Sequence, residues 1–108
     1  MSVFSTFTYV VKFDAIGKNV ALLDKFKGWV KKRPDLFRGL KSYRVFNKFA
    51  GGKFGEFVEM AEFETLSELQ KCYGAVMADK EYLSDYFPEM AEMIIPGTFG
   101  METWESVP

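Results

Sequence analysis

The chain has 108 residues, of which 48% are hydrophobic and 18% aromatic. This length predicts one domain spanning residues 1–108, and the apolar content excludes a disordered chain. Fourteen Lys and Arg are balanced by fifteen Asp and Glu. Binding to a phosphate backbone or to an anionic membrane requires a predominantly positive surface, so we expect neither a nucleic-acid partner nor a membrane partner.

The sequence has a single cysteine, Cys72, and no histidine. One cysteine cannot form an internal disulfide, and the N-terminal residues lack the pattern of a signal peptide, which predicts a cytoplasmic protein. No apolar run approaches the length needed to span a bilayer. Histidine is the commonest proton shuttle near neutral pH, the commonest zinc ligand and the usual haem ligand, so we expect no metal and no cofactor.

The first elements are a strand and a helix. Residues 3–14 are rich in β-forming side chains, and an apolar row alternates with a more polar one. That row consists of Phe7, Tyr9, Val11 and Phe13. After Gly17 the apolar positions follow helical spacing, which predicts a helix from about residue 18 to about residue 32, ended with the help of Pro34.

Two further alternating runs, residues 41–49 and 56–64, flank the glycine-rich segment 50–55, and this pattern predicts a β-hairpin. Thr65 and Glu68 then form a capping box, so a second helix is expected to begin there and to bury Leu69, Cys72 and Val76.

The helical pattern shifts near Ala78 and continues to Ile94, with Pro88 marking a break or a new first turn. Pro96 and Gly97 end this stretch. Residues 98–107 alternate again, so they are predicted to form a last strand with Met101 and Trp104 on opposite sides.

The order of these elements is the ferredoxin-like β-α-β-β-α-β order of an α+β fold. It predicts a four-stranded antiparallel sheet with the helices on one face. Bulky side chains are also expected on the other face, and a second copy of the chain is the obvious cover for them, which predicts a homodimer. These side chains are Thr8, Val10, Phe46, Val58, Met60 and Trp104.

This arrangement resembles the dimeric α+β barrel superfamily, in which two such sheets pack face to face. The resemblance is carried by the element order, by residues 57–63 running into a capped helix, and by residues 86–90 before the last strand. It implies a range of functions: cofactor-independent monooxygenases, haem-degrading enzymes, isomerase-like and cyclase-like proteins, ligand sensors and stress proteins. The haem-degrading branch fits poorly, because its haem-ligating histidine has no counterpart in this chain.

Glu59 is the candidate catalytic residue. It alternates with Phe57, Ala61 and Phe63 and is therefore expected to face the helices, where burial would raise its pKa and suit it to act as an acid or a base. The alternative is that Glu59 lies at the sheet margin or pairs with a basic side chain.

Three more polar residues are candidate ligand-binding residues. Tyr43 and Asn47 share a face of the second strand, and one available hairpin register pairs Asn47 with Glu59. With Tyr9 they would form a small polar cluster in an aromatic pocket, which is typical of small-molecule sites. Alternatively, they satisfy one another at the edge of the core.

Trp29 is a further candidate, because an indole ring can stack on a flat ligand, although packing in the core is the alternative. Cys72 follows Leu69 at helical spacing and is interpreted as a small buried apolar residue.

These features favour a homodimeric protein that binds a small apolar or aromatic ligand. It could be a cofactor-independent oxygenase, isomerase or cyclase acting on an aromatic or lipid-like compound, or a non-catalytic ligand-binding or stress-response module. An enclosed cavity containing Glu59, Asn47 or a tyrosine hydroxyl would indicate the enzyme, whereas a solid interior would indicate the non-catalytic protein.

Overall fold

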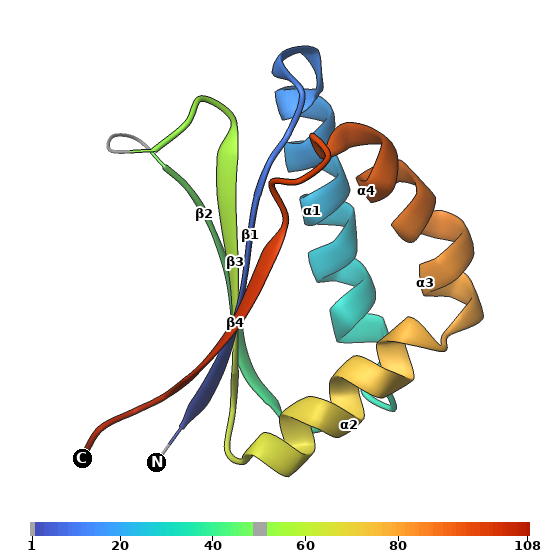
Figure 1. The fold of residues 1–108 in the computed structure, drawn as a ribbon. Coiled ribbons are helices and arrows are strands. Elements are labelled where there is room, and N and C mark those ends of the chain that lie inside the picture. Colours follow the sequence, from blue (N-terminus) through green and yellow to red (C-terminus); the bar gives the residue numbers. More distant parts are fainter. Residues whose placement is uncertain (1, 49–51) are drawn as a thin grey trace.

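The computed structural model describes residues 2–48 and 52–108, which form one antiparallel β-sheet with helices on one face (Figure 1). The strand order is β2-β3-β1-β4. The strands are β1 (Val3–Val10), β2 (Leu40–Asn47), β3 (Glu56–Phe63) and β4 (Gly100–Glu105). The helices are η1 (Phe13–Ala15), α1 (Ile16–Lys32), α2 (Leu66–Met77), α3 (Lys80–Asp85) and α4 (Phe87–Met93). The predicted ferredoxin-like α+β fold is confirmed.

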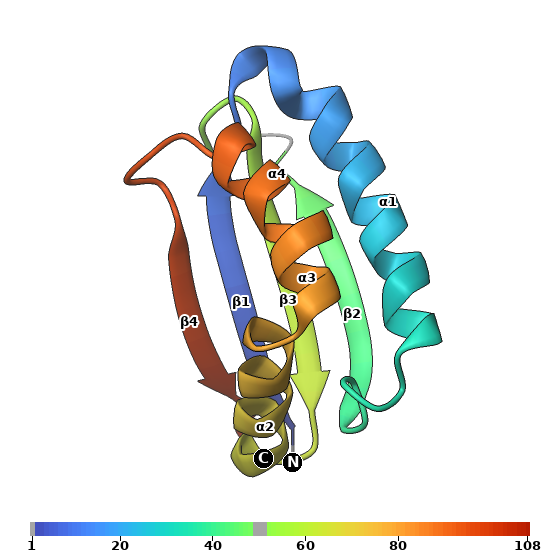
Figure 2. The ribbon, with the colours of Figure 1, turned by 90° about the vertical axis from the view of Figure 1, so that its right-hand side faces the viewer.

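The helices cover one face of the sheet in two groups (Figure 2). Helix α1 lies along the β2 side, whereas α2, α3 and α4 follow one another along the length of β1 and β3. In the described part of the chain, none of the helices is long and apolar enough to cross a membrane.

Strand β1 is shorter than the sequence pattern predicts. It ends at Val10, and the next backbone amides bond elsewhere: Val11 donates to the Gly55 carbonyl and Lys12 to the Met93 carbonyl. The chain therefore leaves the sheet and turns into η1, which leaves the Phe13 side chain 79% exposed. The prediction that the strand reaches residue 14, with Phe13 in the buried row, is wrong because the ladder between β1 and β3 ends at the Val10–Glu56 pair and the chain turns into η1 at Phe13.

The helix boundaries follow local side-chain chemistry. The Thr65 hydroxyl accepts a hydrogen bond from the Glu68 amide at 3.2 Å, as expected of an N-cap. Asp79 caps α3 in the same way, because its carboxylate accepts from the Tyr82 amide. The long C-terminal helical stretch is divided at Tyr86, and Pro88 lies in the first turn of α4, as the sequence predicts.

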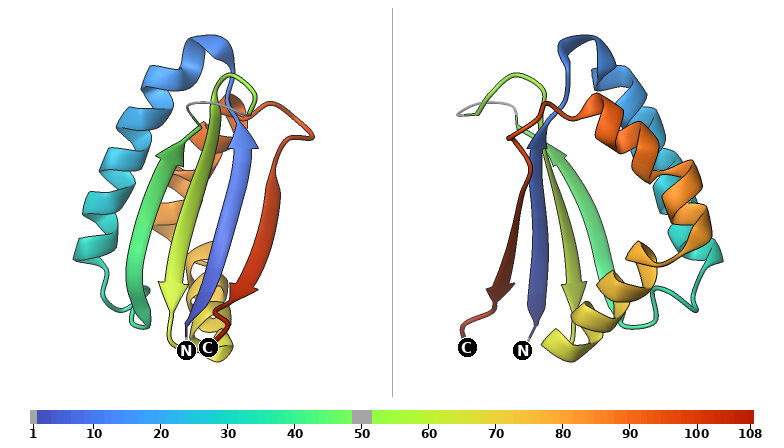
Figure 3. Two further views of the ribbon diagram at one scale, coloured as in Figure 1. Left: turned by 90° about the vertical axis from the view of Figure 1, so that its left-hand side faces the viewer. Right: turned by 45° about the vertical axis from the view of Figure 1, so that its right-hand side comes forward.

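The sheet face opposite the helices has no cover from the described residues (Figure 3). The pairing register places the predicted outer-face residues on this side of the sheet: Phe46, Val58 and Thr8 form one cross-strand row. Val10, at the end of β1, is buried, so it is not part of the exposed surface. Met60 lies opposite Thr6, and Trp104 is 55% exposed. The sheet therefore presents the aromatic side chains of Phe46 and Trp104 to solvent on an uncovered face.

Candidate functional site

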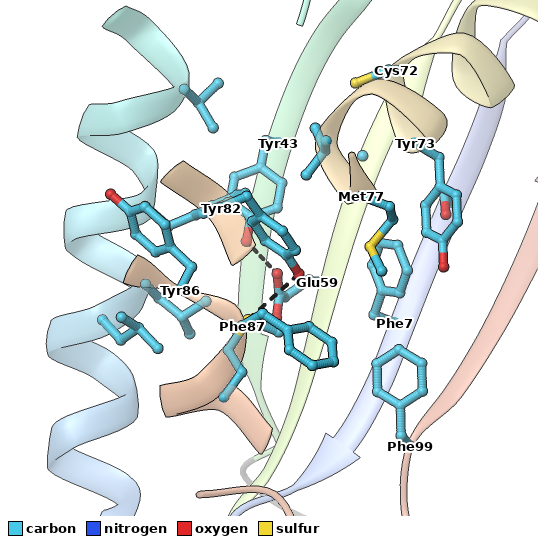
Figure 4. Close-up of a pocket in the computed structure, with 18 of the residues that line it drawn as sticks. Phe7, Tyr43, Glu59, Cys72, Tyr73, Met77, Tyr82, Tyr86, Phe87 and Phe99 are labelled. Carbon is cyan, nitrogen blue, oxygen red and sulfur yellow. Dashed lines mark hydrogen bonds between the residues drawn. The ribbon is translucent and has the colours of Figure 1, made fainter. Parts of the chain in front are cut away.

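A cavity of about 530 Å³ lies between the sheet and the helices (Figure 4). Its walls come from β1, β2, β3 and all four α-helices, and ten of the lining residues are aromatic. The size is in the range of pockets that hold drug-sized molecules. The helices therefore do not pack solidly on the sheet, and the predicted cavity is present.

The cavity opens to solvent between α2, α4 and the start of β4. Tyr73, Met77, Phe87 and Phe99 line the cavity and are also exposed, so they form its rim. Phe7 stacks on Tyr73 with ring centroids 6.4 Å apart and packs against Phe99 at 5.9 Å. A ligand would enter between aromatic side chains, which favour flat or apolar molecules.

Glu59 lies on the floor of the cavity, at the centre of the sheet. Its Cα pairs with Phe7 on β1 and with Val45 on β2. The side chain is only 8% exposed and faces the helices, as strand alternation predicts.

Two tyrosines reach Glu59 diagonally from the neighbouring strands. Tyr9 is one cross-strand row away, opposite Phe57, and its hydroxyl donates to Glu59 Oε2 at 2.5 Å. Tyr43 is in the row on the other side, opposite Ala61, and its hydroxyl donates to Glu59 Oε1. Aromatic side chains span such diagonal separations. Each carboxylate oxygen therefore has one fixed donor and a further lone pair.

Burial raises the pKa of the Glu59 carboxyl, and the hydrogen bonds from Tyr43 and Tyr9 oppose that rise without cancelling it. Burial, followed by the charge of Glu59, raises the pKa of both Tyr9 and Tyr43. The two tyrosines thus stay protonated as donors at neutral pH, and the Glu59 carboxyl binds its proton more tightly than an exposed glutamate does.

Asn19 on α1 extends the cluster, and sequence reasoning missed it. Its side chain is 2% exposed, and its Nδ2 lies 3.4 Å from the Tyr9 hydroxyl, to which it donates. Its spacing from Leu22 and Leu23 on the buried face of α1 was the available signal.

Tyr82 on α3 is a second missed residue. In Figure 4 its hydroxyl points toward Glu59, and the hydroxyl donates to the Met90 sulfur at 3.9 Å. Burial and the charge of Glu59 raise the pKa of Tyr82 to about 12. Because a sulfur is a weak acceptor, this hydroxyl remains available to a ligand.

Three candidate residues do not line the cavity: Tyr9, whose hydroxyl nevertheless bonds to Glu59, and Asn47 and Trp29. The expected pairing of Asn47 with Glu59 is wrong, because Asn47 pairs with Phe57 and its side chain is exposed. Trp29 is buried among Phe26, Phe37 and other rings, with Arg33 over its face, and it does not line the cavity. Its indole N–H has no hydrogen-bond partner. The structure brings Glu59, Tyr9 and Tyr43 together, but not Asn47 or Trp29.

Cys72 lines the cavity from α2 and is buried. Burial raises the pKa of its thiol to about 11, so the thiol is protonated and unreactive at neutral pH, in keeping with an apolar packing role. Among the described residues, no three His, Cys, Asp or Glu side chains are close enough to hold a metal ion.

No family model matches the sequence, and none of the curated proteins is detectably similar to it. Solved structures with the same fold do exist. A NIPSNAP family protein from Agrobacterium tumefaciens superposes with a TM-score of 0.74 at 11% identity, covering 99% of this chain and 94% of that one. A NIPSNAP domain protein from Burkholderia xenovorans gives 0.76 at 8% identity, covering 97% and 94%.

An antibiotic biosynthesis monooxygenase is similar as well, with a TM-score of 0.66 at 17% identity, covering 98% of this chain and 99% of that one. At such identities the likeness concerns the fold alone. The chain therefore shares the ferredoxin-like α+β fold of these structures.

Proposed function

We propose that this protein binds a small, largely apolar molecule, aromatic or lipid-like, in the sheet–helix cavity, and that Glu59 exchanges a proton with it. The observation that supports this most is a cavity of about 530 Å³ with aromatic walls and one buried carboxylate on its floor. An interior built only for stability would be packed at this point.

The geometry suits a reaction that needs a base and no cofactor. A carboxyl with a raised pKa is a better proton acceptor than an exposed one, and Tyr9 and Tyr43 hold it in one orientation. Isomerases, cyclases and oxygenases whose substrates supply their own reactivity fit this arrangement. One protein with a similar fold is described as an antibiotic biosynthesis monooxygenase, and an oxygenase reaction is among those that fit this site. A non-catalytic ligand-binding module would use the same pocket without turnover.

We propose in addition that the protein is a homodimer whose subunits meet through the uncovered outer face of the sheet. Phe46 and Trp104 are about half exposed there, in line with Val58 and Met60. The same face also has charged residues, among them Arg44 opposite Met60 and Glu102 opposite Thr6. A small protein nevertheless seldom leaves large apolar side chains gathered on one face in water. The cavity lies on the opposite side of the sheet, so each subunit would keep its own site.

The test of the proposed function is a thermal-shift screen with quinols, aromatic acids, fatty acids and hydrophobic amines, followed by soaking of crystals and mass spectrometry of the products. A hit should stabilise the protein and give density between Glu59 and the rim residue Phe99. Glu59→Gln should abolish turnover while leaving the binding of uncharged ligands largely intact. Asn47→Ala, outside the cavity, is the matched control. The proposal fails if no compound class binds, or if a bound compound lies outside the cavity.

A further inference from the structure

The carboxylates of this chain differ in how their charge is balanced. Asp79 lies 2.8 Å from Arg33, Glu56 lies 2.8 Å from Lys48, and the more exposed Glu62 lies 3.8 Å from Lys41. Each of these partly buried carboxylates has a cation supplied by the chain.

Glu59 is more deeply buried than these three and has no cation partner among the described residues. Its two donors are neutral tyrosine hydroxyls, which supply hydrogen bonds but no compensating charge. No Lys or Arg of the described chain lines the cavity. Buried charges in proteins are normally paired, so the ionised form of Glu59 requires a cation that the described chain does not supply.

The surroundings of Glu59 are those that organic cations prefer. Tyr43, Tyr82, Tyr86 and Phe87 line the cavity around it, and aromatic faces attract ammonium groups. One ring of this group already has a cation over it: the Lys25 ammonium lies 5.0 Å from the centre of the Tyr86 ring.

We propose that the ligand of this cavity is a hydrophobic amine, bound as its ammonium ion with the charge paired to Glu59 and the apolar body between the aromatic walls. This inference rests on the proposed function of the cavity as a ligand site and adds the charge class of the ligand. Carboxylic acids are disfavoured, because the site offers a second negative charge and no cation to balance it.

Binding of the amine is coupled to the loss of a proton from Glu59. The groups that face Glu59 are Tyr9 from β1, Tyr43 from β2 and Tyr82 from α3, with Cys72 lining the cavity from α2. The pKa of each of these four groups is raised, so all of them are neutral near pH 7. Burial also raises the pKa of Glu59, so an ammonium ligand ionises it and releases its proton. Amine affinity therefore increases as pH rises, until Glu59 is ionised in the empty site.

The experiment compares three ligands with one skeleton: 2-naphthylmethylamine, 2-naphthylmethanol and 2-naphthylacetic acid. Isothermal titration calorimetry at neutral pH should rank the amine first and the acid last, with roughly tenfold or more between amine and alcohol, equal to about 1.4 kcal/mol. Repeating the amine titration in buffers of different ionisation enthalpy, at a pH below the Glu59 midpoint, should show proton release.

Glu59→Gln should remove the advantage of the amine and leave the affinity for the alcohol within about threefold of the original. If the alcohol binds to the unmodified protein as tightly as the amine, the proposal of an ammonium ligand is wrong, although the cavity remains a ligand site. Amine binding that survives Glu59→Gln would overturn that proposal too. If none of the three ligands binds, the proposed function itself fails together with this inference.

Discussion

The two faces of the sheet come from the same four strands, yet they differ in what covers them. The helix-facing side is covered but hollow, and it contains the buried carboxylate Glu59. The outer side has no helices over it, and Phe46 and Trp104 are half exposed there (Figure 3). Apolar residues alone thus do not distinguish a core from a cavity or an interface. Only the covered face can enclose a ligand, because its helices leave a cavity between themselves and the sheet.

The largest effect is expected on the outer face. Met60→Lys would place a charge in the proposed subunit interface and should weaken dimerisation by about 2–5 kcal/mol. Sedimentation velocity at micromolar concentration should show a dimer for the original protein and a monomer for the variant. Gln70→Lys on the exposed side of α2 is the matched control and should stay dimeric. An unmodified protein that sediments as a monomer would show that this face has no such role.

The next prediction tests whether the covered face is hollow. Ala61 lines the cavity, so Ala61→Leu should add apolar volume into open space and change the free energy of unfolding by less than about 1 kcal/mol, while reducing ligand affinity. Ala15 is buried in the packed core away from the cavity, so Ala15→Leu should destabilise by about 1–3 kcal/mol. Both values come from urea denaturation. Equal destabilisation of the two variants would indicate a filled interior.

A third prediction concerns the pH dependence of stability. The pKa of Glu59 is raised on folding, so the folded state holds more protons, and its stability should fall as pH rises from the unfolded pKa, about 4.3, through the folded value. Glu59→Gln should remove that slope. Asp79 is the opposite case: hydrogen bonds from Arg33 lower its pKa, so its stabilisation is lost as pH falls, and Asp79→Asn removes that loss.

Urea denaturation of the original protein and both variants from pH 3 to pH 8 measures these slopes. If the original protein and Glu59→Gln follow parallel curves, Glu59 is not a desolvated acid.

The smallest effect is expected at Asn47, which is exposed and distant from Glu59 in the register. Asn47→Ala should change the free energy of unfolding by less than about 0.5 kcal/mol and leave ligand affinity unchanged. Asn19→Ala, by contrast, removes a buried donor to Tyr9 and should destabilise the protein measurably. A loss of ligand affinity in Asn47→Ala would show that Asn47 takes part in ligand binding after all.

The residues on each sheet face could be predicted from the sequence, because alternation along β1 and β3 fixes the side to which each residue points. Glu59 and Met60 are examples, on opposite faces. The N-cap at Thr65 is equally local and was predicted correctly.

The partners of Glu59 were less predictable, because they depend on register. The hairpin pairs Val45 with Glu59, two residues away from the expected pairing with Asn47. A shift of two residues keeps every side chain on its face, so alternation cannot detect it. Asn19 and Tyr82 come from helices, and their approach to the site depends on how those helices sit over the sheet, which no local pattern encodes.

The central claim is that Glu59 is a buried carboxyl without a cation of its own. Carbon-13 NMR of protein labelled at the glutamate carboxyl carbons measures this directly, with Glu59→Gln identifying the resonance. We predict a titration midpoint for Glu59 above the ordinary value of about 4.3, and midpoints below it for the ion-paired Glu56 and Glu62. A Glu59 midpoint at or below the ordinary value would contradict the claim.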